Sequence, residues 1–192
     1  REAVEGVRSR GLGQAVVVSG DPGVGKSAVL GAFAVGLGGD LRDATGVSVL
    51  RVEPQVGGES APYGLIARVV RLCLDGAPRE AGAEAPTLTM ALEAAVLRWA
   101  SSPAGQRAAL RALRVCLGLE GDEPGAEAAT TRELALVLRP MLSERAAARP
   151  LALLVDGVEL GDAPSRALLA DLVRRPPAAA VLTVVALRDD DP

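Results

Sequence analysis

The pattern with the clearest chemical meaning lies near the start of the chain, where a glycine and four further residues precede Gly-Lys-Ser. It consists of Gly20, Asp21, Pro22, Gly23, Val24, Gly25, Lys26 and Ser27, and it matches a phosphate-binding loop in full. The glycines let the backbone turn sharply and bring amide groups close to phosphate oxygens. Lys26 would place an ammonium on the β- and γ-phosphates, and the Ser27 hydroxyl is a ligand for Mg²⁺. The pattern therefore predicts binding of a nucleoside triphosphate with Mg²⁺.

Two features of the surrounding sequence favour this interpretation over a chance match in a glycine-rich turn. Residues 14–19 form a short apolar run that predicts a buried strand, and residues 26–37 are predicted to form a helix. This is the context that the motif requires, because the helix N-terminus adds unpaired N–H groups. Lys26 is also the only lysine in a chain whose other basic residues are all arginine, and it stands where a compact point charge is needed.

A second candidate is Asp156, which directly follows the apolar run 151–155. Such a run predicts a buried strand. A carboxylate at its end emerges at the edge where ligands of open α/β sheets bind. We therefore expect Asp156 to hold Mg²⁺, directly or through water.

The group that would activate an attacking water is less well defined, because Gly157 follows Asp156 and has no side chain. Glu159 would share the face of residue 157 if the strand continued; the alternative is a solvated surface acid. Asp162 is a weaker candidate that could simply cap the next helix. Arg188 directly follows a fourth predicted strand, where it either senses a γ-phosphate or lies in solvent beside three acids.

The remaining elements predict how these residues are brought together. The other two strands are expected over 47–52 and 180–186, and the other helices over 62–74, 90–100, 107–119, 130–148 and 164–174. Alternating strands and helices predict an α/β, three-layer P-loop core with a parallel sheet. In this sheet we expect the first strand beside the fourth, and the third between the fourth and the second.

A helical insertion is expected over 62–148, between the second and third strands. Residues 1–61 and 149–192 would then be the P-loop half and the Walker B half of one domain. In the last helix of the insertion, Thr130 or Thr131 is expected to act as the N-cap, and Pro140 to kink or split the helix.

Composition sets further limits. The chain has 192 residues, of which 49% are hydrophobic and only 2% aromatic, so small aliphatic side chains must fill the core of one globular domain. The net charge of −3 gives no reason to expect nucleic acid or a membrane surface as partner. No apolar run is long enough to cross a bilayer and no signal peptide opens the chain, so the cytoplasm is the expected location.

Catalysis by histidine is excluded, because the chain contains none. Zinc sites of the Cys/His type and Ser-His-Asp or Cys-His catalysis are therefore excluded as well. Cys73 and Cys116 are isolated in the sequence, and we expect both to fill the core.

Several of these segments together resemble one family. The chain resembles the ATPase domain of signal-transduction ATPases with numerous domains (STAND), and most closely the AAA-type domain of large ATP-binding LuxR-family transcriptional regulators. The segments that carry the resemblance are residues 1–2, the phosphate-binding loop with its preceding residues (18–27), the Pro-Tyr segment (61–65), the Walker B stretch (149–165) and the strand with its following Arg and acids (184–190).

The resemblance implies ATP rather than another nucleotide, and slow hydrolysis that serves as a switch in a larger regulator. It also implies that helical repeats and a DNA-binding domain lie elsewhere in the parent chain, so that this segment does not itself bind nucleic acid. It leaves room for nucleotide-dependent self-association. From the resemblance we carry over Gly20 to Ser27, Asp156 and Arg188, but no general base.

Three departures from the family pattern bear on function. Gly157 replaces the second acid of an Asp-Asp pair, Glu159 and Leu160 replace His-Trp, and the chain ends before the fifth strand and the lid of such a core. The first departure keeps a non-hydrolytic, nucleotide-gated interaction module open as an alternative, beside a small-molecule kinase. A GTPase is disfavoured because the chain has no asparagine, and its single lysine is in the P-loop.

Overall fold

The computed structural model describes residues 2–37, 46–53, 62–75, 87–121, 124–125 and 127–189. Four strands in this part form one parallel sheet in the order β1-β4-β3-β2. They are β1 (Gln14–Ser19), β2 (Ser48–Val52), β3 (Leu151–Val155) and β4 (Val181–Leu187). The α/β class, the four strands and their order are therefore confirmed.

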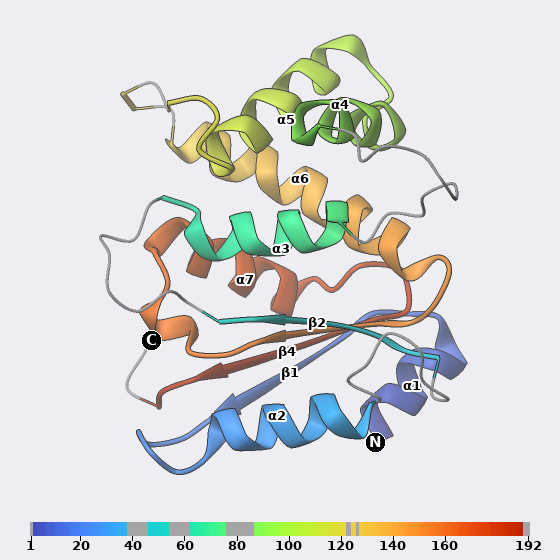
Figure 1. The fold of residues 1–192 in the computed structure, drawn as a ribbon, viewed down its shortest axis with the longest axis vertical. Coiled ribbons are helices and arrows are strands. Elements are labelled where there is room, and N and C mark those ends of the chain that lie inside the picture. The colour runs from blue at the N-terminus through green and yellow to red at the C-terminus, as the bar shows by residue number, and fades with distance from the viewer. Residues whose placement is uncertain are drawn as a thin grey trace.

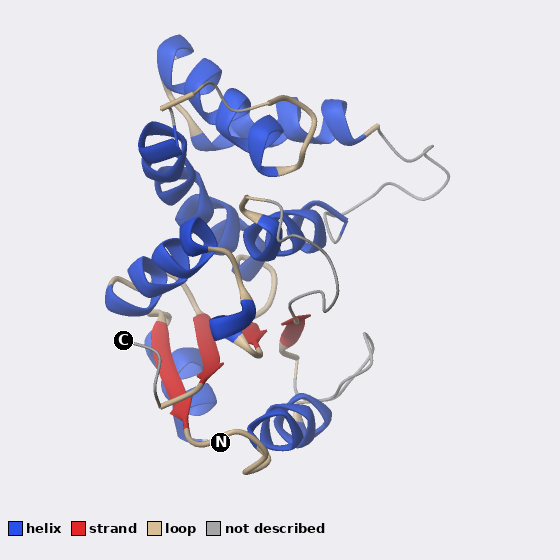
Figure 2. Ribbon diagram, turned by 90° about the vertical axis from the view of Figure 1, so that its left-hand side faces the viewer, coloured by secondary structure: helices blue, strands red, loops and turns tan. Residues whose placement is uncertain are grey.

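The helices lie in layers on both sides of the sheet (Figure 1). On one side are α1 (Glu2–Arg10) and α2 (Lys26–Gly36), and on the other are α3 (Gly64–Asp75) and α7 (Ala163–Arg174). The insertion consists of α4 (Leu88–Trp99), α5 (Pro103–Cys116) and α6 (Glu127–Ala146). Figure 2 shows these helices stacked beyond the layer that covers the sheet. The predicted helical insertion between β2 and β3 is confirmed.

The sheet separates two hydrophobic clusters because successive side chains of a strand point to opposite faces. In β3, Leu151, Leu153 and Val155 belong to the cluster shared with α3, α6 and α7. Ala152 and Leu154 belong to the cluster shared with α1 and α2. A strand buried on both faces is apolar throughout, which is why its sequence shows a continuous apolar run instead of alternation.

The helix boundaries differ from the prediction at several N-termini. Helices α4 and α5 begin earlier than expected because Thr87 and Ser102 cap them, the two hydroxyls accepting from the amides of Met90 and Gly105 at 3.3 and 3.1 Å. Helix α1 was not expected at all. Its apolar face is short, and it is held by the packing of Val7 against the sheet.

Helix α6 corrects the expected N-cap and the expected split at Pro140. It begins at Glu127, so Thr130 and Thr131 lie inside the first turn and neither is the N-cap. It also continues through Pro140 without splitting, although proline removes one backbone hydrogen bond. The reason is tertiary packing: Leu138, Met141 and Leu142 beside the proline are at most 2% exposed.

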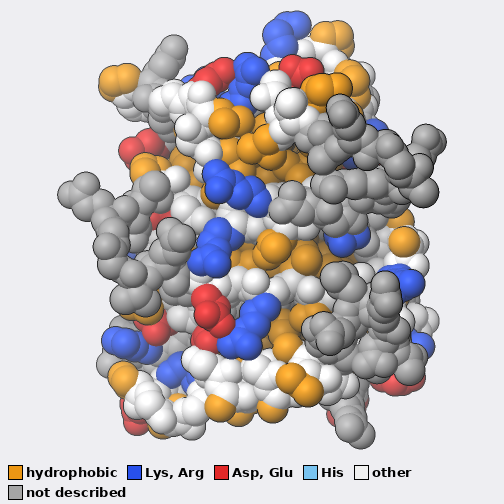
Figure 3. Space-filling view, viewed as in Figure 1, with side chains coloured by type: hydrophobic (Ala, Val, Ile, Leu, Met, Phe, Trp, Pro, Cys, Tyr) orange, Lys and Arg blue, Asp and Glu red, His pale blue; other side chains and the backbone are white. Residues whose placement is uncertain are grey.

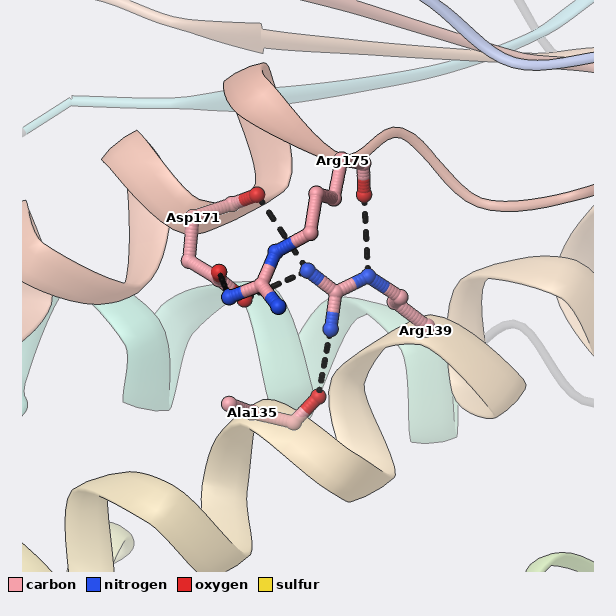
Figure 4. A network of polar contacts seen from close by, with 4 residues as sticks. All are labelled: Ala135, Arg139, Asp171 and Arg175. Atoms are coloured by element: carbon pink, nitrogen blue, oxygen red, sulfur yellow. Dashed lines mark hydrogen bonds and ion pairs between the residues drawn. The ribbon is translucent and has the colours of Figure 1, made fainter.

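Helices α6 and α7 are joined by a partly buried polar network (Figure 4). Arg139 donates to the carbonyl oxygens of Ala135, Asp171 and Arg175 at 3.2, 3.2 and 2.9 Å, and it forms an ion pair with the Asp171 carboxylate. Arg175, one turn after Asp171, pairs with the same carboxylate. Burial alone would raise the pKa of Asp171, but the hydrogen bonds from the two arginines outweigh it and hold this pKa below its usual 3.8.

This network predicts a pH dependence of stability. Because the pKa of Asp171 is lower in the folded state, the unfolded chain takes up the proton first. The stabilisation that the charged Asp171 carboxylate provides is therefore present above about pH 4. It is lost as the pH falls through the pKa of Asp171 in the folded state. We expect Asp171→Asn to lower the free energy of unfolding by about 2 kcal/mol at pH 7, and the difference to shrink toward zero below pH 4. Urea unfolding of both proteins from pH 7 to 3 measures this, and a difference independent of pH would contradict it.

A second stability prediction concerns the central strand β4. Thr183 is fully buried, and its Oγ1 has no hydrogen-bond partner among the described residues. Valine has nearly the same shape without the polar atom, so Thr183→Val should raise the free energy of unfolding by about 1 kcal/mol. The matched control is Thr131→Val, which removes a hydroxyl that does have a partner, the Tyr63 hydroxyl at 3.1 Å. Urea unfolding should show opposite signs for the two variants; equal losses would refute this account of Thr183.

Candidate nucleotide-binding site

Three predicted site segments meet at one edge of the sheet. The register places Ser19 level with Leu187, and Val155 level with Val185. Strands β1 and β4 therefore end level with each other, β3 ends two residues earlier, and the three strands are followed by Gly20, Arg188 and Asp156. Because β4 lies between the other two strands, the backbones of β1 and β3 are about 10 Å apart, a span that a triphosphate with its metal ion can bridge.

The loop after β1 has the backbone that phosphate binding requires. Gly23 and Gly25 have φ values of 82° and 96°, a left-handed conformation that favours glycine. A Cβ built at either position would meet nothing within 4 Å. The loop is therefore open, and its amides are accessible to a ligand.

The N-terminus of α2 has no side-chain cap, unlike the N-termini of α4, α5 and α7. Gly25 is its N-cap and provides no side-chain hydrogen bond, and its first turn has no acid. Helices α4, α5 and α7 are instead capped by the side chains of Thr87, Ser102 and Asp162. The free amides and the helix dipole of α2 thus remain available to an anion.

Lys26 folds back over this loop. Its Nζ donates to the carbonyl oxygens of Gly20 and Asp21 at 2.6 and 2.9 Å. The ammonium thus lies across the loop, beside the free amides of α2, where it can exchange carbonyl partners for phosphate oxygens. The open loop, the uncapped N-terminus of α2 and the Lys26 ammonium fit a nucleoside triphosphate.

Asp156 and Ser27 are the residues that fit Mg²⁺. Asp156 is 8% exposed and its amide donates to Val52 at 3.0 Å, which aligns the end of β3 with the end of β2. Ser27 is exposed in the first turn of α2. Within the described ranges no three Asp, Glu, Cys or His side chains cluster as a metal cage. An ion here would thus depend on phosphate oxygens and water for its other ligands, as Mg²⁺ commonly does.

Strand β3 ends at Val155, as predicted, so the condition under which Glu159 would share the face of residue 157 is not met. Gly157 is left-handed, with φ 59° and ψ 42°, and a short 3₁₀ turn, η1 (Val158–Leu160), follows. This turn brings the Glu159 carboxylate to Arg188, with Oε1 3.2 Å from Nε. The Glu159 side chain is only 14% exposed, so it is not a solvated surface acid. The Arg188 side chain is 45% exposed and lies in solvent, as one alternative from sequence had it, but it is paired with Glu159.

Asp162 is the N-cap of α7, as the sequence suggested. Its Oδ1 accepts from the Ser165 amide at 2.8 Å and from the Tyr63 amide at 2.9 Å. Sequence reasoning missed the second bond, and with it Tyr63. One signal was present, since Tyr63 is the only tyrosine of the chain, just as Lys26 is its only lysine.

The two cysteines are buried, as expected, on α3 and α5. Burial raises the pKa of both thiols to about 12. They therefore remain protonated and unreactive near neutral pH, and the chemistry of the site rests on oxygen and nitrogen groups.

Comparison with protein families agrees with this geometry. The model of the AAA ATPase domain matches residues 1–185. The chain belongs to the AAA ATPase domain family. A search of curated proteins finds no match. Family membership and the P-loop geometry together assign ATP binding to this domain, with Mg²⁺ as the usual companion ion. No helix in the described ranges has the length and apolar character to cross a membrane.

Proposed function

We propose that this AAA domain is a Mg-ATP-dependent switch of a larger regulatory protein, of the LuxR-family or STAND type, and that it hydrolyses ATP slowly. The observation that supports this most directly is the open loop before α2. Its helix amides are uncapped, the Lys26 ammonium lies across it, and Asp156 and Arg188 follow strands that end at the same edge.

The roles of the residues follow from their positions. The amides of the loop and of α2 would hold the β- and γ-phosphates, with Lys26 neutralising their charge. Ser27 and Asp156 would hold Mg²⁺. Bound Mg-ATP supplies the metal charge and the phosphoryl group that water attacks in line. Asp21, Pro22 and Val24 shape the loop through their backbone.

The Glu159–Arg188 pair is proposed to control the attack. With the two groups bonded to each other, the carboxylate is held away from water. Arg188 directly follows β4, so a γ-phosphate near Lys26 would compete with Glu159 for its guanidinium. Glu159 would then be free to orient or deprotonate the attacking water. In this scheme nucleotide binding breaks the ion pair between Glu159 and Arg188 and thereby changes the η1 turn that carries Glu159.

A second candidate function is retained on one observation. Gly157 offers no side chain after Asp156, and its left-handed backbone disfavours most other residues. A domain without a competent base would bind ATP and signal by shape alone. Turnover distinguishes a switch ATPase from such a non-hydrolytic module.

The test is calorimetric titration of the protein with ATP in Mg²⁺ or in EDTA, and with GTP in Mg²⁺, together with phosphate release from the same sample. The proposal expects Mg²⁺-dependent ATP binding, weaker GTP binding, and slow release of phosphate. Binding without release would identify the non-hydrolytic module. A folded protein that binds no ATP would contradict both the switch ATPase and the non-hydrolytic module.

Partners and location form the last part of the proposal. On the face in Figure 3, basic side chains lie at separate places with acidic and apolar ones between them. This supports a domain that leaves nucleic-acid binding to other parts of its parent chain. The two free cysteines fit a reducing, cytoplasmic setting. Nucleotide-dependent self-association stays a prediction, which sedimentation with and without Mg-ATP would test.

A further inference from the structure

Tyr63 has an unusual backbone conformation, although it lies outside the glycine-rich loop after β1. Its φ is +63°, which among the described non-glycine residues is the only positive value. A bulky side chain rarely adopts this region, and such strain persists only where the surroundings impose it. The Tyr63 side chain is fully buried, directly before the first residue of α3.

The hydroxyl of Tyr63 is bonded to the start of α6. It donates to the Glu127 carbonyl at 3.0 Å and is 3.1 Å from the Thr131 hydroxyl. Glu127 and Thr131 belong to the first turns of the last helix of the insertion. The side chain of Tyr63 thus connects the start of α3 with the last helix of the insertion, 64 residues later.

The backbone of Tyr63 is bonded to the segment after Asp156. Its amide donates to Asp162 Oδ1 at 2.9 Å, and the neighbouring amide of Ile66 donates to the Ser165 hydroxyl at 3.3 Å, both across 99 residues. Packing adds to these bonds, because a Cβ at Gly161 would lie 3.2 Å from Leu65. The turn η1 and the cap of α7 are therefore held against the first turn of α3.

We propose that Tyr63 is a positioning residue that links the helical insertion to the turn carrying Glu159. Its hydroxyl is fixed by α6, its strained backbone presents the amide to Asp162, and Asp162 closes the segment that begins at Asp156. A shift of α6 is thereby transmitted to η1 and to the Glu159–Arg188 pair. The consequence for turnover rests on the proposed function, whereas the mechanical link does not.

The arrangement of the bonds explains how the link reaches both α7 and η1. Asp162 Oδ1 accepts from Tyr63 and from Ser165 at once, so displacing Tyr63 changes the cap of α7 and the end of η1 together. The η1 turn itself has only two short-range backbone bonds, from Leu160 to Gly157 and from Gly161 to Val158, each 3.0 Å. A turn of three residues cannot hold its own geometry with so few bonds, so the outside contact decides its position.

The test compares Tyr63→Phe, Asp162→Ala and Asp162→Asn with Ser102→Ala. The last is a matched control, because it removes a cap of the same kind from α5. Amide hydrogen exchange at Leu160 and Gly161 is measured on the nucleotide-free protein, and kcat and the ATP dissociation constant are measured beside it. We expect exchange to quicken about tenfold in Asp162→Ala and about threefold in Tyr63→Phe, with Asp162→Asn close to wild type.

The same variants should separate turnover from binding. In Asp162→Ala and Tyr63→Phe we expect kcat to fall about tenfold and about threefold, while the ATP dissociation constant changes less than twofold. Ser102→Ala should change neither, nor exchange in η1. Unchanged exchange in Tyr63→Phe, or an equal change in Ser102→Ala, would overturn the proposal. If wild type shows no turnover, the proposed hydrolysis fails and the exchange data alone decide on Tyr63.

Discussion

Lys26→Ala should lower the affinity for Mg-ATP at least 100-fold and reduce phosphate release below detection. The substitution removes the ammonium that lies across the loop, 2.6 Å from the Gly20 carbonyl. Charge-assisted contacts with two phosphates are worth about 3 kcal/mol, which corresponds to about 100-fold in affinity. Calorimetry measures the affinity. The stabilisation of the fold by saturating Mg-ATP should disappear with it.

The matched control for Lys26 is Arg8→Ala. It removes one positive charge from an exposed position on α1, which precedes β1 and so lies at the opposite edge of the sheet from the loop. Its ATP affinity should equal that of wild type. Lys26→Arg provides a further comparison, because a planar guanidinium replaces a point charge poorly in this narrow setting. Wild-type affinity in Lys26→Ala would mean that nucleotide binds elsewhere or not through this loop.

Glu159→Gln should lower kcat about 100-fold or more and leave ATP affinity within twofold of wild type. The amide keeps the size of the side chain but cannot take a proton, and positioned general bases contribute 10²–10⁴-fold, so the loss falls in about this range. It also removes the ion pair with Arg188, and should therefore release Arg188 before nucleotide binds. Single-turnover phosphate release, with affinity measured separately, distinguishes lost chemistry from lost binding.

Glu120→Gln is the matched control, since Glu120 pairs with Arg114 at 2.9 Å at the end of α5. It removes an acid and an ion pair without touching the sheet edge, so kcat should not change. Equal turnover in Glu159→Gln and wild type would exclude Glu159 as the base. The hydrolytic role would then pass to another group, or the non-hydrolytic module would become the better description.

The strand pattern and the loop could be predicted from local sequence alone. Short apolar runs bounded by glycine and proline mark buried strands, and alternation with helices restricts their order. Strand β3 was therefore placed at its observed bounds, and the order β1-β4-β3-β2 was anticipated. The loop was predicted as readily, because phosphate binding depends on a few contiguous residues whose conformations are set by their own types. The Lys26 ammonium bonds to the carbonyl oxygen of Gly20, six residues earlier, and Gly25 is the N-cap of the helix that begins at Lys26.

Boundaries and partners that depend on distant packing could not be predicted in this way. A strand ending in Asp156 could continue or turn, and only the left-handed Gly157 and the pairing of Glu159 with Arg188 decide it. Pro140 stands inside a continuous α6 because buried neighbours compensate for the missing bond. Each of these outcomes is a balance of long-range contacts worth a few kcal/mol, which local propensity does not record.

For this protein, the sequence by itself predicted the glycine-rich loop before α2, the strand order and the position of the insertion. Each of these follows from residue types within one loop or one element. Only the tertiary structure decided which groups act together at the site. The bonds of Tyr63 and Ile66 to the start of α7 join residues 99 positions apart. These bonds form because α3 and α7 cover the same face of the sheet, and no short stretch of sequence contains this arrangement.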